Sequence, residues 1–318
     1  MTNKMIGEDP QLRGVIDAAG RIADTDVTVL LQGESGTGKE VLARHIHDHS
    51  RRVERPFVTV NCAALPEALA ESLLFGHCKG AFTGAAARHD GYICAAAGGT
   101  LFLDEVAELP AAVQAKLLRF LENGEVLPLG ATRAVRVDVR IVAATHRELQ
   151  HAVADGAFRA DLFHRLNVVP LRLPPLREHR DDIALLLAHF LQRMAVRHGI
   201  APPRLDSASL GLLQAYRWPG NVRELRNLCE RLVVLYPDSA VTPAQLPVEL
   251  QPPTRIRSAN DELYAFPLPA EGVSLEQVEV DLIRQALERA SGNRSGAARL
   301  LGISRDTLLY RLKKFAIA

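Results

Sequence analysis

Apolar and polar positions alternate along the chain with two different periods. Short apolar runs rich in β-branched residues lie within 27–32, 56–65, 98–104 and 135–145, and segments of helical periodicity, such as 110–124, separate them. Buried strands that alternate with helices are typical of a parallel sheet covered by helices. We therefore predict an α/β fold in which polar residues gather at the carboxyl ends of the strands.

The pattern changes at about Pro174, where the strand-like runs stop. Three helices are predicted within 180–199, 206–218 and 221–236, so a helical subdomain is expected to follow the sheet. Several prolines then fall between 247 and 269. Because proline lacks a backbone donor and keeps the chain extended, this stretch is predicted to be a linker.

Three more helices are predicted at the end of the chain. The first is amphipathic, because apolar residues recur every three or four positions: Leu275, Val278, Leu282, Ala286 and Ala290. Two shorter helices, at about 295–301 and 305–315, follow it, and Ser304 is the expected N-cap of the last one. The predicted domains are 1–173 (α/β), 174–246 (helical), 247–272 (linker) and 273–318 (all-α).

Charge is balanced over the whole chain but not along it. Lys and Arg number 38 against 37 Asp and Glu, yet residues 291–318 carry a clear basic excess, which favours a polyanion-binding tail. No apolar run is long enough to cross a bilayer, and the amino terminus has no signal-peptide pattern. Four scattered cysteines fit reduced thiols better than a disulfide framework. We expect a cytoplasmic, multidomain protein.

A glycine-rich turn, GESGTGKE, joins the first predicted strand to a helix, with the spacing of a phosphate loop. Glycines let backbone amides surround phosphate oxygens, and the helix adds its partially positive end. Lys39 should reach the β- and γ-phosphates, whereas Glu40 stands where the general pattern has Ser or Thr. The predicted nucleotide-binding residues of the turn are Gly33, Glu34, Ser35, Gly36, Thr37, Gly38, Lys39 and Glu40.

The third predicted strand ends on two carboxylates, Asp104 and Glu105. At phosphoryl-transfer sites one acidic residue holds Mg²⁺ and another orients the attacking water. We assign the first role to Asp104 and the second to Glu105. The phosphate loop followed along the chain by this carboxylate pair predicts an ATPase that uses ATP and Mg²⁺.

Five stretches together resemble the bacterial enhancer-binding proteins, which are AAA+ ATPases that activate sigma-54 RNA polymerase. They are GESGTGKE, GAFTGA (80–85), GGTLFLDE (98–105), FRADLFHRLNV (158–168) and WPGNVRELRN (218–227). The resemblance covers roughly residues 5–245, and the last helices are similar to the family's Fis-type helix-turn-helix. The resemblance implies a AAA+ sheet with a helical lid. It also implies that the protein hydrolyses ATP to remodel the closed sigma-54 holoenzyme complex into an open one, and that the active form is a hexameric homo-oligomer.

The GAFTGA stretch places Phe82 between glycines, where a packed strand would not be built. An apolar tip on a compliant loop is typical of a partner site. In the family that the chain resembles, this loop grips sigma-54 and moves with the nucleotide state. The expected sigma-54 contacts are therefore Gly80, Ala81, Phe82, Thr83, Gly84 and Ala85; a folded-down, buried Phe82 is the alternative for one nucleotide state.

The resemblance also implies roles for polar residues outside these loops. Asn61 corresponds to the switch asparagine that relays the γ-phosphate state to Glu105, and Thr145 ends the sensor strand beside His146, where many relatives carry Asn. Arg159 and Arg165 match the arginine fingers that reach a neighbouring subunit's ATP. Arg223 resembles the lid's sensor arginine, acting on its own subunit's nucleotide.

Two departures flank the GAFTGA stretch, because Leu73 and Cys78 replace glutamates that relatives commonly carry. They bring the strength of coupling between loop and nucleotide into question, and Cys78 is read as a tolerated small residue rather than a redox switch. His45, His47 and His49 also invite a metal interpretation. His45 and His49 share a helix face but His47 does not, so a solvated helix surface is favoured.

In the predicted tail, the final helix turns Leu308 and Leu312 inward. Recognition helices present their first turns to the major groove, so Arg305 and Thr307 are the expected base contacts. The other predicted DNA-binding residues are Tyr310, Arg311, Lys313 and Lys314. Such modules usually bind palindromes as dimers, and a basic protein-interaction module is the alternative.

Two other functions compete with sigma-54 activation: a DNA-binding regulator that nucleotide switches without sigma-54, and a AAA+ remodeller of another substrate. The intact GAFTGA argues against the first, and the helix-turn-helix argues against the second. Only about 32 residues precede the phosphate loop, so a complete chain would be controlled in trans, by a regulatory partner or by its own abundance.

Overall fold

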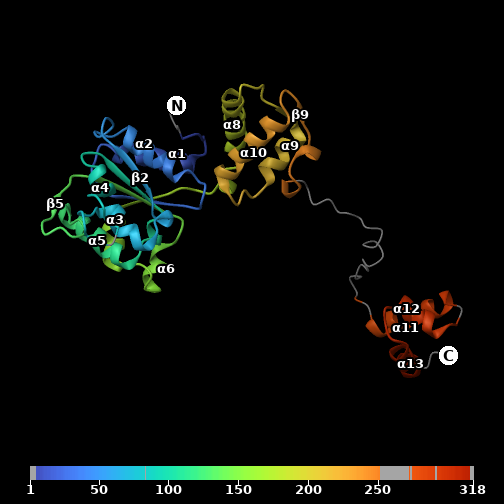
Figure 1. Cartoon of the computed structure of the whole chain (residues 1–318). Helices are drawn as coiled ribbons and strands as arrows, with labels where there is room; N and C mark the ends of the chain where they lie inside the picture. The colour runs from blue at the N-terminus through green and yellow to red at the C-terminus, as the bar shows by residue number, and fades with distance from the viewer. Residues whose placement is uncertain (1–4, 83, 251–271, 273, 291, 316–318) are drawn as a thin grey trace. The chain divides into compact units, whose positions relative to one another are not determined.

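The computed structural model describes residues 5–82, 84–250, 272, 274–290 and 292–315. The chain divides into two compact units, Met1–Pro252 and Pro253–Ala318 (Figure 1). The first unit contains the predicted sheet and the helical subdomain, and the second contains the three helices of the tail.

A five-stranded parallel sheet forms the centre of the first unit, in the order β2-β3-β6-β1-β7. The strands are β1 (Val29–Gln32), β2 (Phe57–Asn61), β3 (Thr100–Asp104), β6 (Arg140–Thr145) and β7 (Val169–Arg172). The first four match the apolar runs of the sequence. β7 was not predicted, because it contains Pro170. The strand lies at the sheet edge, where Val169 N donates to Thr28 O just before β1 and Leu173 N donates to Gln32 O at its end, so that position 170 faces away.

Alternate residues of each strand enter two separate cores, as expected of a sheet with both faces covered. Val29, Leu31, Phe102 and Val142 pack under α1 (Pro10–Ala23) and α2 (Lys39–Asp48). The neighbouring positions, such as Leu30, pack on the other face under α3 (Glu67–Phe75), α4 (Gly91–Ala95), α5 (Ala111–Asn123) and α7 (Ala160–Leu166). Figure 1 shows the two groups of helices on opposite sides of the strands.

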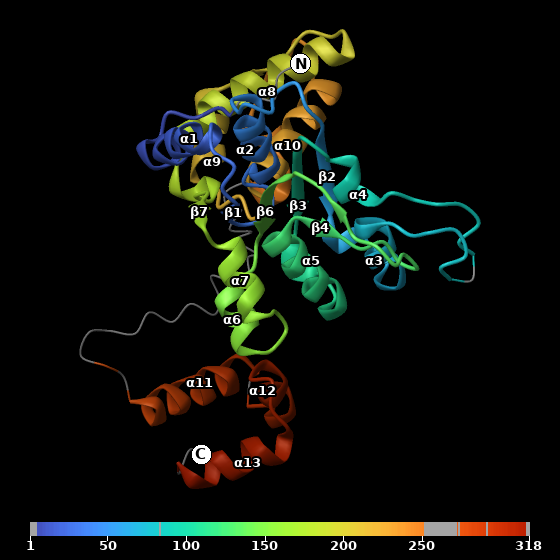
Figure 2. The ribbon, with the colours of Figure 1, turned by 90° about the vertical axis from the view of Figure 1, so that its left-hand side faces the viewer.

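Short elements complete this layer and carry its loops. They are η1 (Cys62–Ala64), η2 (Val106–Glu108), the hairpin strands β4 (Glu125–Val126) and β5 (Val135–Arg136), and α6 (Leu149–Ala154). In Figure 2 the segment between α3 and α4, which contains the GAFTGA stretch, projects from the body beside the hairpin.

The helical subdomain, or lid, packs around Trp218, which is fully buried. Its elements are η3 (Leu176–Glu178), α8 (Asp182–His198), β8 (Arg204–Leu205), α9 (Ser207–Ala215), α10 (Asn221–Leu235), β9 (Ala240–Val241), η4 (Pro243–Gln245) and η5 (Val248–Leu250). Leu250 lies in the same core, so the lid extends four residues past the boundary expected at 246. Residues 251–271 of the expected linker lie outside the described residues.

The second unit consists of α11 (Leu275–Arg289), α12 (Arg294–Leu300) and α13 (Arg305–Lys314). Its small core contains Ile283, Ala286, Ala297, Leu308 and Leu312. The Ser304 hydroxyl accepts from Thr307 N at 3.1 Å, which confirms the predicted N-cap of α13. Gly302, with φ 65°, provides the left-handed turn between α12 and α13.

Candidate nucleotide site and partner surfaces

The GESGTGKE turn joins β1 to α2 and adopts backbone angles that favour glycine. Gly36 has φ 81°, and a Cβ there would lie 2.3 Å from the carbonyl oxygen of Gly220 in the lid. Gly38, with φ 101°, is the N-cap residue of α2. The turn therefore points its amides and a helix N-terminus at one spot, which suits an anionic phosphate chain.

Lys39 is buried at the first position of α2. Its Nζ donates to the carbonyl oxygens of Gly33 at 2.8 Å and Glu34 at 3.2 Å, and lies 3.9 Å from Glu105 Oε1. Burial lowers the pKa of Lys39, while the nearby charges of Glu105 and Asp104 act in the opposite direction. The ammonium is thus held between the loop and the carboxylates, where it can meet phosphate oxygens.

The carboxylates lie where β3 ends, as the sequence predicts. Glu105 has the left-handed backbone angles φ 53° and ψ 49°, a strained conformation that is most often found at functional sites. Its Oε2 accepts from His146 N at 3.2 Å and lies 2.6 Å from His146 Nδ1. Burial, and next the charge of Glu105, raises the pKa of Asp104. A divalent cation here would offset that crowding of negative charge, so the donor set fits Mg²⁺.

Asn61 and Thr145 end the strands that flank β3. Asn61 is paired with Asp104 in the sheet register, and its Oδ1 accepts from Ala63 N at 3.0 Å. Thr145 is buried, and its hydroxyl accepts from Arg147 N at 3.0 Å. Glu105 therefore bonds to His146, while the side chain of Asn61 caps η1.

The lid bonds to the outer side of the phosphate loop through residues of two segments, η3 and α10. Arg177 forms a bidentate ion pair with Glu34, at 2.7 and 2.8 Å, and this pairing is the main cause of a lowered Glu34 pKa. The fully buried Asn221 donates to Ser35 O at 3.0 Å and accepts from Leu176 N at 2.8 Å. Arg223 donates to Ser35 Oγ at 2.8 Å. The loop and the lid are thus joined by a network of charged and polar bonds.

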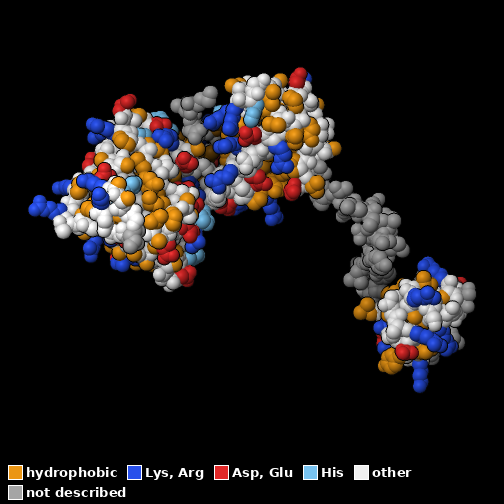
Figure 3. Space-filling model, in the orientation of Figure 1, with side chains coloured by type: hydrophobic (Ala, Val, Ile, Leu, Met, Phe, Trp, Pro, Cys, Tyr) orange, Lys and Arg blue, Asp and Glu red, His pale blue; other side chains and the backbone are white. Residues whose placement is uncertain are grey.

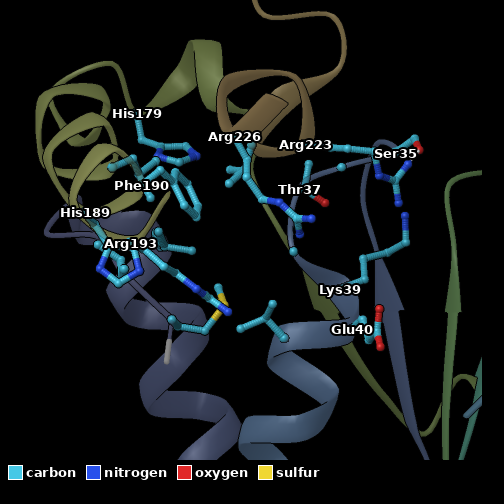
Figure 4. A pocket seen from close by; sticks show the side chains of 18 of the residues that line it. Ser35, Thr37, Lys39, Glu40, His179, His189, Phe190, Arg193, Arg223 and Arg226 are labelled. Carbon is cyan, nitrogen blue, oxygen red and sulfur yellow. Dashed lines mark hydrogen bonds between the residues drawn. The ribbon is translucent and has the colours of Figure 1, made fainter. Parts of the chain in front are cut away.

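A cavity of about 240 Å³ lies between the phosphate loop and the lid. One end carries Lys39, Asp104, Glu105 and Arg223, and the other is lined by residues that the sequence reasoning did not single out: Met5, Ile6, Leu12, His179, Leu186, His189, Phe190, Arg193, Val222 and Arg226. Figure 4 shows Phe190, His189 and Arg193 across the cavity from Ser35, Lys39 and Glu40. A polar phosphate end and a more apolar end match the two halves of a nucleotide.

The predicted arginine fingers lie in and next to α7. Arg159 is the N-cap residue of this helix and pairs with Asp161 at 2.7 Å. Arg165 lies six residues further on, in the last turn of the helix, and is exposed. The sequence places both in the last turns before β7, and the structure leaves Arg165 accessible to another chain.

The GAFTGA stretch is tied down at its base and turned at its tip. His77 and His89 exchange backbone bonds of 2.8 and 3.0 Å, and Cys78 N donates to Leu129 O in the β4–β5 hairpin at 2.9 Å. The Phe82 ring lies edge-on to the His77 ring with centroids 5.0 Å apart, and the side chain is 36% exposed. Thr83, an expected sigma-54 contact, lies outside the described residues.

Basic residues of the second unit fall into two groups. Arg305 and Lys313 are exposed, as is the neighbouring Tyr310 at 70%, whereas Arg311 pairs with Glu279 and Lys314 with Glu276 at 3.6 Å, both on α11. The Thr307 hydroxyl is 2.7 Å from Ser304 Oγ. Figure 3 shows Lys and Arg side chains gathered on the visible face of this unit. Of the expected DNA contacts, Arg305, Lys313 and Tyr310 are thus the more accessible.

The described residues also bear on metal binding, disulfide formation and membrane insertion. No group of three or more His, Cys, Asp or Glu side chains that could by itself hold a metal ion occurs among them, and His47 is instead buried against Thr100. The four cysteines are free, and burial raises the pKa of Cys62 to about 12. No helix in the part of the chain that the structure describes is long and apolar enough to cross a membrane.

A parallel sheet with a phosphate loop, a carboxylate pair on the adjacent strand end and a helical lid bonded to that loop defines the AAA+ class of P-loop NTPases. Comparison with known families narrows this class. Residues 5–172 match the sigma-54 interaction domain, residues 177–262 match the AAA+ ATPase lid domain, and residues 274–315 match the Fis family of bacterial regulatory proteins. The chain belongs to the family of sigma-54 activators.

Curated relatives agree with this family. The chain is 46% identical over 320 residues to the response regulator PilR of Pseudomonas aeruginosa, covering 99% of this chain and 70% of the relative. It is 44% identical to the regulatory protein AtoC of Escherichia coli, over 98% of this chain and 68% of that one. Among solved structures, NtrX of Brucella abortus in complex with ADP has a TM-score of 0.73 and 36% identity, covering 100% of this chain and 70% of its own.

Proposed function

We propose that the chain hydrolyses ATP and uses the energy to remodel a closed sigma-54 promoter complex into an open one while bound to upstream DNA. The observation that carries the proposal is the combination, in one chain, of the phosphate-loop cavity with a GAFTGA stretch and a Fis-type tail. The related NtrX has been solved with ADP and with ATP, which supports nucleotide binding at this cavity.

The site supports a division of labour in hydrolysis. The loop amides and Lys39 would hold the β- and γ-phosphates, Asp104 would hold Mg²⁺, and the bound ion would offset phosphate charge. Glu105 would polarise the attacking water, and its bond to His146 holds the carboxylate at the end of β6. Asn61, one strand away, would relay the γ-phosphate state to Glu105.

The remaining charge on the transferring phosphoryl group needs a donor from outside the subunit. Arg165 is exposed on α7, and the Arg159 side chain pairs with the neighbouring Asp161 at the start of that helix, so both suit the role of arginine fingers in trans. Such a finger raises the rate by about 10³–10⁵. The active species would then be a homo-oligomeric ring, hexameric by the family resemblance.

Conformational changes at the nucleotide site would reach both the lid and the GAFTGA stretch. The Glu34–Arg177 pair and the Asn221 bonds connect the phosphate loop to the lid. β2, which pairs with β3, continues through η1 and α3 into the GAFTGA stretch. The loop tip, from Gly80 to Ala85, would contact sigma-54. Phe82, which rests on His77 but is still partly exposed, would be the main apolar contact.

The test separates hydrolysis from partner contact by Thr83→Ala, with Ala86→Ser as a control at an exposed position just outside the motif. We expect Thr83→Ala to hydrolyse ATP at a rate close to that of the parent while activating no sigma-54 transcription in a purified system. Ala86→Ser should keep both activities. Normal activation by Thr83→Ala would refute the role given to the loop and favour a nucleotide-switched DNA-binding regulator.

A further inference from the structure

A buried carboxylate on the lid lies outside the phosphate end of the site. Asp182, the first residue of α8, is only 2% exposed. Its Oδ1 accepts from Glu8 N at 2.6 Å and Asp9 N at 3.3 Å, and its Oδ2 lies 3.1 Å from Nδ1 of the buried His179. A buried charge is expensive unless it is fully bonded, so these contacts give Asp182 a defined structural task.

Asp182 holds the segment of residues 5–9, which we call the N-terminal strap. Met5 of the strap packs with the core under α1 and α2, and Ile6 packs with the core of the lid. Both side chains line the cavity, and a Cβ at Gly38 of the phosphate loop would be 3.8 Å from the sulfur of Met5. The strap therefore forms a wall of the nucleotide cavity that contacts both the sheet layer and the lid.

Gly7 shows how closely the strap approaches the carboxylate. A Cβ at this position would lie 2.8 Å from Asp182 Oδ2 and 2.4 Å from Leu12 Cδ2. Any larger residue would have to move the strap or displace these side chains. On the far side of Gly7, the Asp9 side chain caps α1 by accepting from Gln11 N at 2.8 Å and Leu12 N at 3.1 Å. Carboxylates thus hold the carboxyl-terminal end of the strap, since Asp182 binds its last two amides and Asp9 joins it to the first turn of α1.

The same carboxylate also orients His179. Nδ1 of His179 lies 3.1 Å from Asp182 Oδ2, and this contact between two buried side chains fixes the orientation of the ring. His179 lines the end of the cavity that lies away from Lys39, as Figure 4 shows. One buried group therefore positions two parts of the cavity wall, a backbone segment and a ring.

We propose that Asp182 is a positioning residue for the base end of the nucleotide cavity, acting through the N-terminal strap and His179. The inference rests on the proposed ATP hydrolysis and deepens it. Because the strap and His179 line the end of the cavity opposite Lys39, the loss of Asp182 should weaken nucleotide binding and leave the chemical step nearly unchanged. Binding that is lost without a loss of turnover is the signature of a group that acts on ground state and transition state alike.

The experiment uses the full chain with Asp182→Asn and Gly7→Ala, and with Asp181→Asn as a matched control. Asp181 is exposed and adjacent, so it carries the same charge change without these bonds. We measure ADP binding by calorimetry, KM and kcat for ATP, and hydrogen exchange of the amides of residues 5–12. Asp182→Asn and Gly7→Ala should raise Kd and KM about tenfold or more, as expected for lost bonds to a charged group.

In the same variants kcat should stay within about twofold of the parent, and the strap amides should exchange faster. Asp181→Asn should match the parent throughout. The positioning role is wrong if both variants bind ADP as the parent does, or if they lose kcat while KM stays unchanged. The proposed function stands in either case, provided that the parent hydrolyses ATP. If Asp182→Asn unfolds the lid, Gly7→Ala decides, because it leaves every lid residue in place. A parent that binds no ATP or ADP would overturn the proposed function as well as this role.

Discussion

At the scale of single residues, Glu105 combines a strained backbone with a prearranged carboxylate. Its φ of 53° costs free energy that the fold has to supply, and His146 holds Oε2 through both its amide and its ring. Oε1 is meanwhile 3.9 Å from Lys39 Nζ. This geometry keeps the carboxylate between the lysine of the phosphate loop and the end of β6, where an attacking water would have to lie.

Replacing Glu105 by Gln should therefore lower kcat for ATP by at least about 10²-fold, the range for a lost general base, while ADP binding stays close to that of the parent. Glu108→Gln is the control, because Glu108 lies in the adjacent η2 and pairs with Arg147 at 2.8 Å outside the site. Steady-state hydrolysis and calorimetry give the two quantities. A Glu105→Gln variant with the parent's turnover would remove Glu105 from the mechanism.

At the scale of elements, α2 is joined to β3 by a buried polar pair. His47 Nδ1 lies 3.0 Å from the hydroxyl of the fully buried Thr100, and the imidazole ring is 5.1 Å from that of Phe57. Burial lowers the pKa of His47 below its ordinary value. The helix that begins at the phosphate loop is thus held to the central sheet by a neutral imidazole.

The sign of the pH effect follows from this lowered pKa. Below about pH 6.5 the unfolded chain protonates His47 and the folded chain resists it, so unfolding becomes easier as the pH falls. One such proton contributes at most about 1.4 kcal/mol per pH unit to the slope of the unfolding free energy. The free energy of unfolding can be measured with denaturant at several pH values between about 7.5 and 5.5, the window set by that pKa. It should fall less steeply with falling pH for His47→Asn than for the parent.

His49→Asn is the matched comparison, because His49 is exposed at the C-cap of α2, two residues from His47. It should keep the parent's slope. Equal slopes for the parent and His47→Asn would show that the imidazole is not desolvated in the folded protein.

The joint between lid and phosphate loop depends on Asn221, which is fully buried and has φ 51°. Asn221→Ala would leave the amide of Leu176 and the carbonyl of Ser35 without their partner and would place alanine in a left-handed conformation. Asn221→Gly loses the same bonds but tolerates the backbone angles. We expect the free energy of unfolding to fall by about 1–3 kcal/mol in Asn221→Gly and by about 1 kcal/mol more in Asn221→Ala.

Fluorescence of Trp218 measures this loss directly, because it is the chain's single tryptophan and lies buried in the lid. The unfolding midpoint should fall in the order parent, Asn221→Gly, Asn221→Ala. A parent-like midpoint for Asn221→Gly would mean that the side-chain bonds contribute no net stability to the joint.

The sequence predicted those elements whose pattern is local. Four strands, the phosphate loop, the carboxylates of β3 and the Ser304 cap all follow from runs of a few residues. β7 escaped because Pro170 interrupts its strand pattern, and only the sheet edge makes proline tolerable there. The base end of the cavity and the Glu34–Arg177 pair escaped for another reason: they join residues from distant parts of the chain, which no periodicity relates.

At the scale of the whole molecule, the proposed arginine fingers mean that each ATP site needs Glu105 from one subunit and Arg165 from its neighbour. Glu105→Gln and Arg165→Ala should each be nearly inactive alone, the second by about 10³-fold or more. A mixture should regain activity, because an Arg165→Ala subunit keeps Glu105 and receives Arg165 from a Glu105→Gln neighbour. Hydrolysis rates over a range of mixing ratios test this.

The control mixes Arg165→Ala with the double variant Glu105→Gln/Arg165→Ala, in which no site can contain both groups. That mixture should stay inactive at every ratio. Failure of the first mixture to regain activity, or full activity of Arg165→Ala alone, would place the finger within its own subunit or elsewhere in the chain.

The most direct measurement for the central claim is open-complex formation by purified sigma-54 holoenzyme on a duplex promoter with an upstream site for this protein. The reaction is run with ATP and with a non-hydrolysable analogue, and promoter melting is followed by permanganate reactivity. The account predicts melting with ATP and none with the analogue. No melting under either condition, with ATP hydrolysis intact, would contradict the account and assign the chain to regulators that act on DNA without remodelling sigma-54.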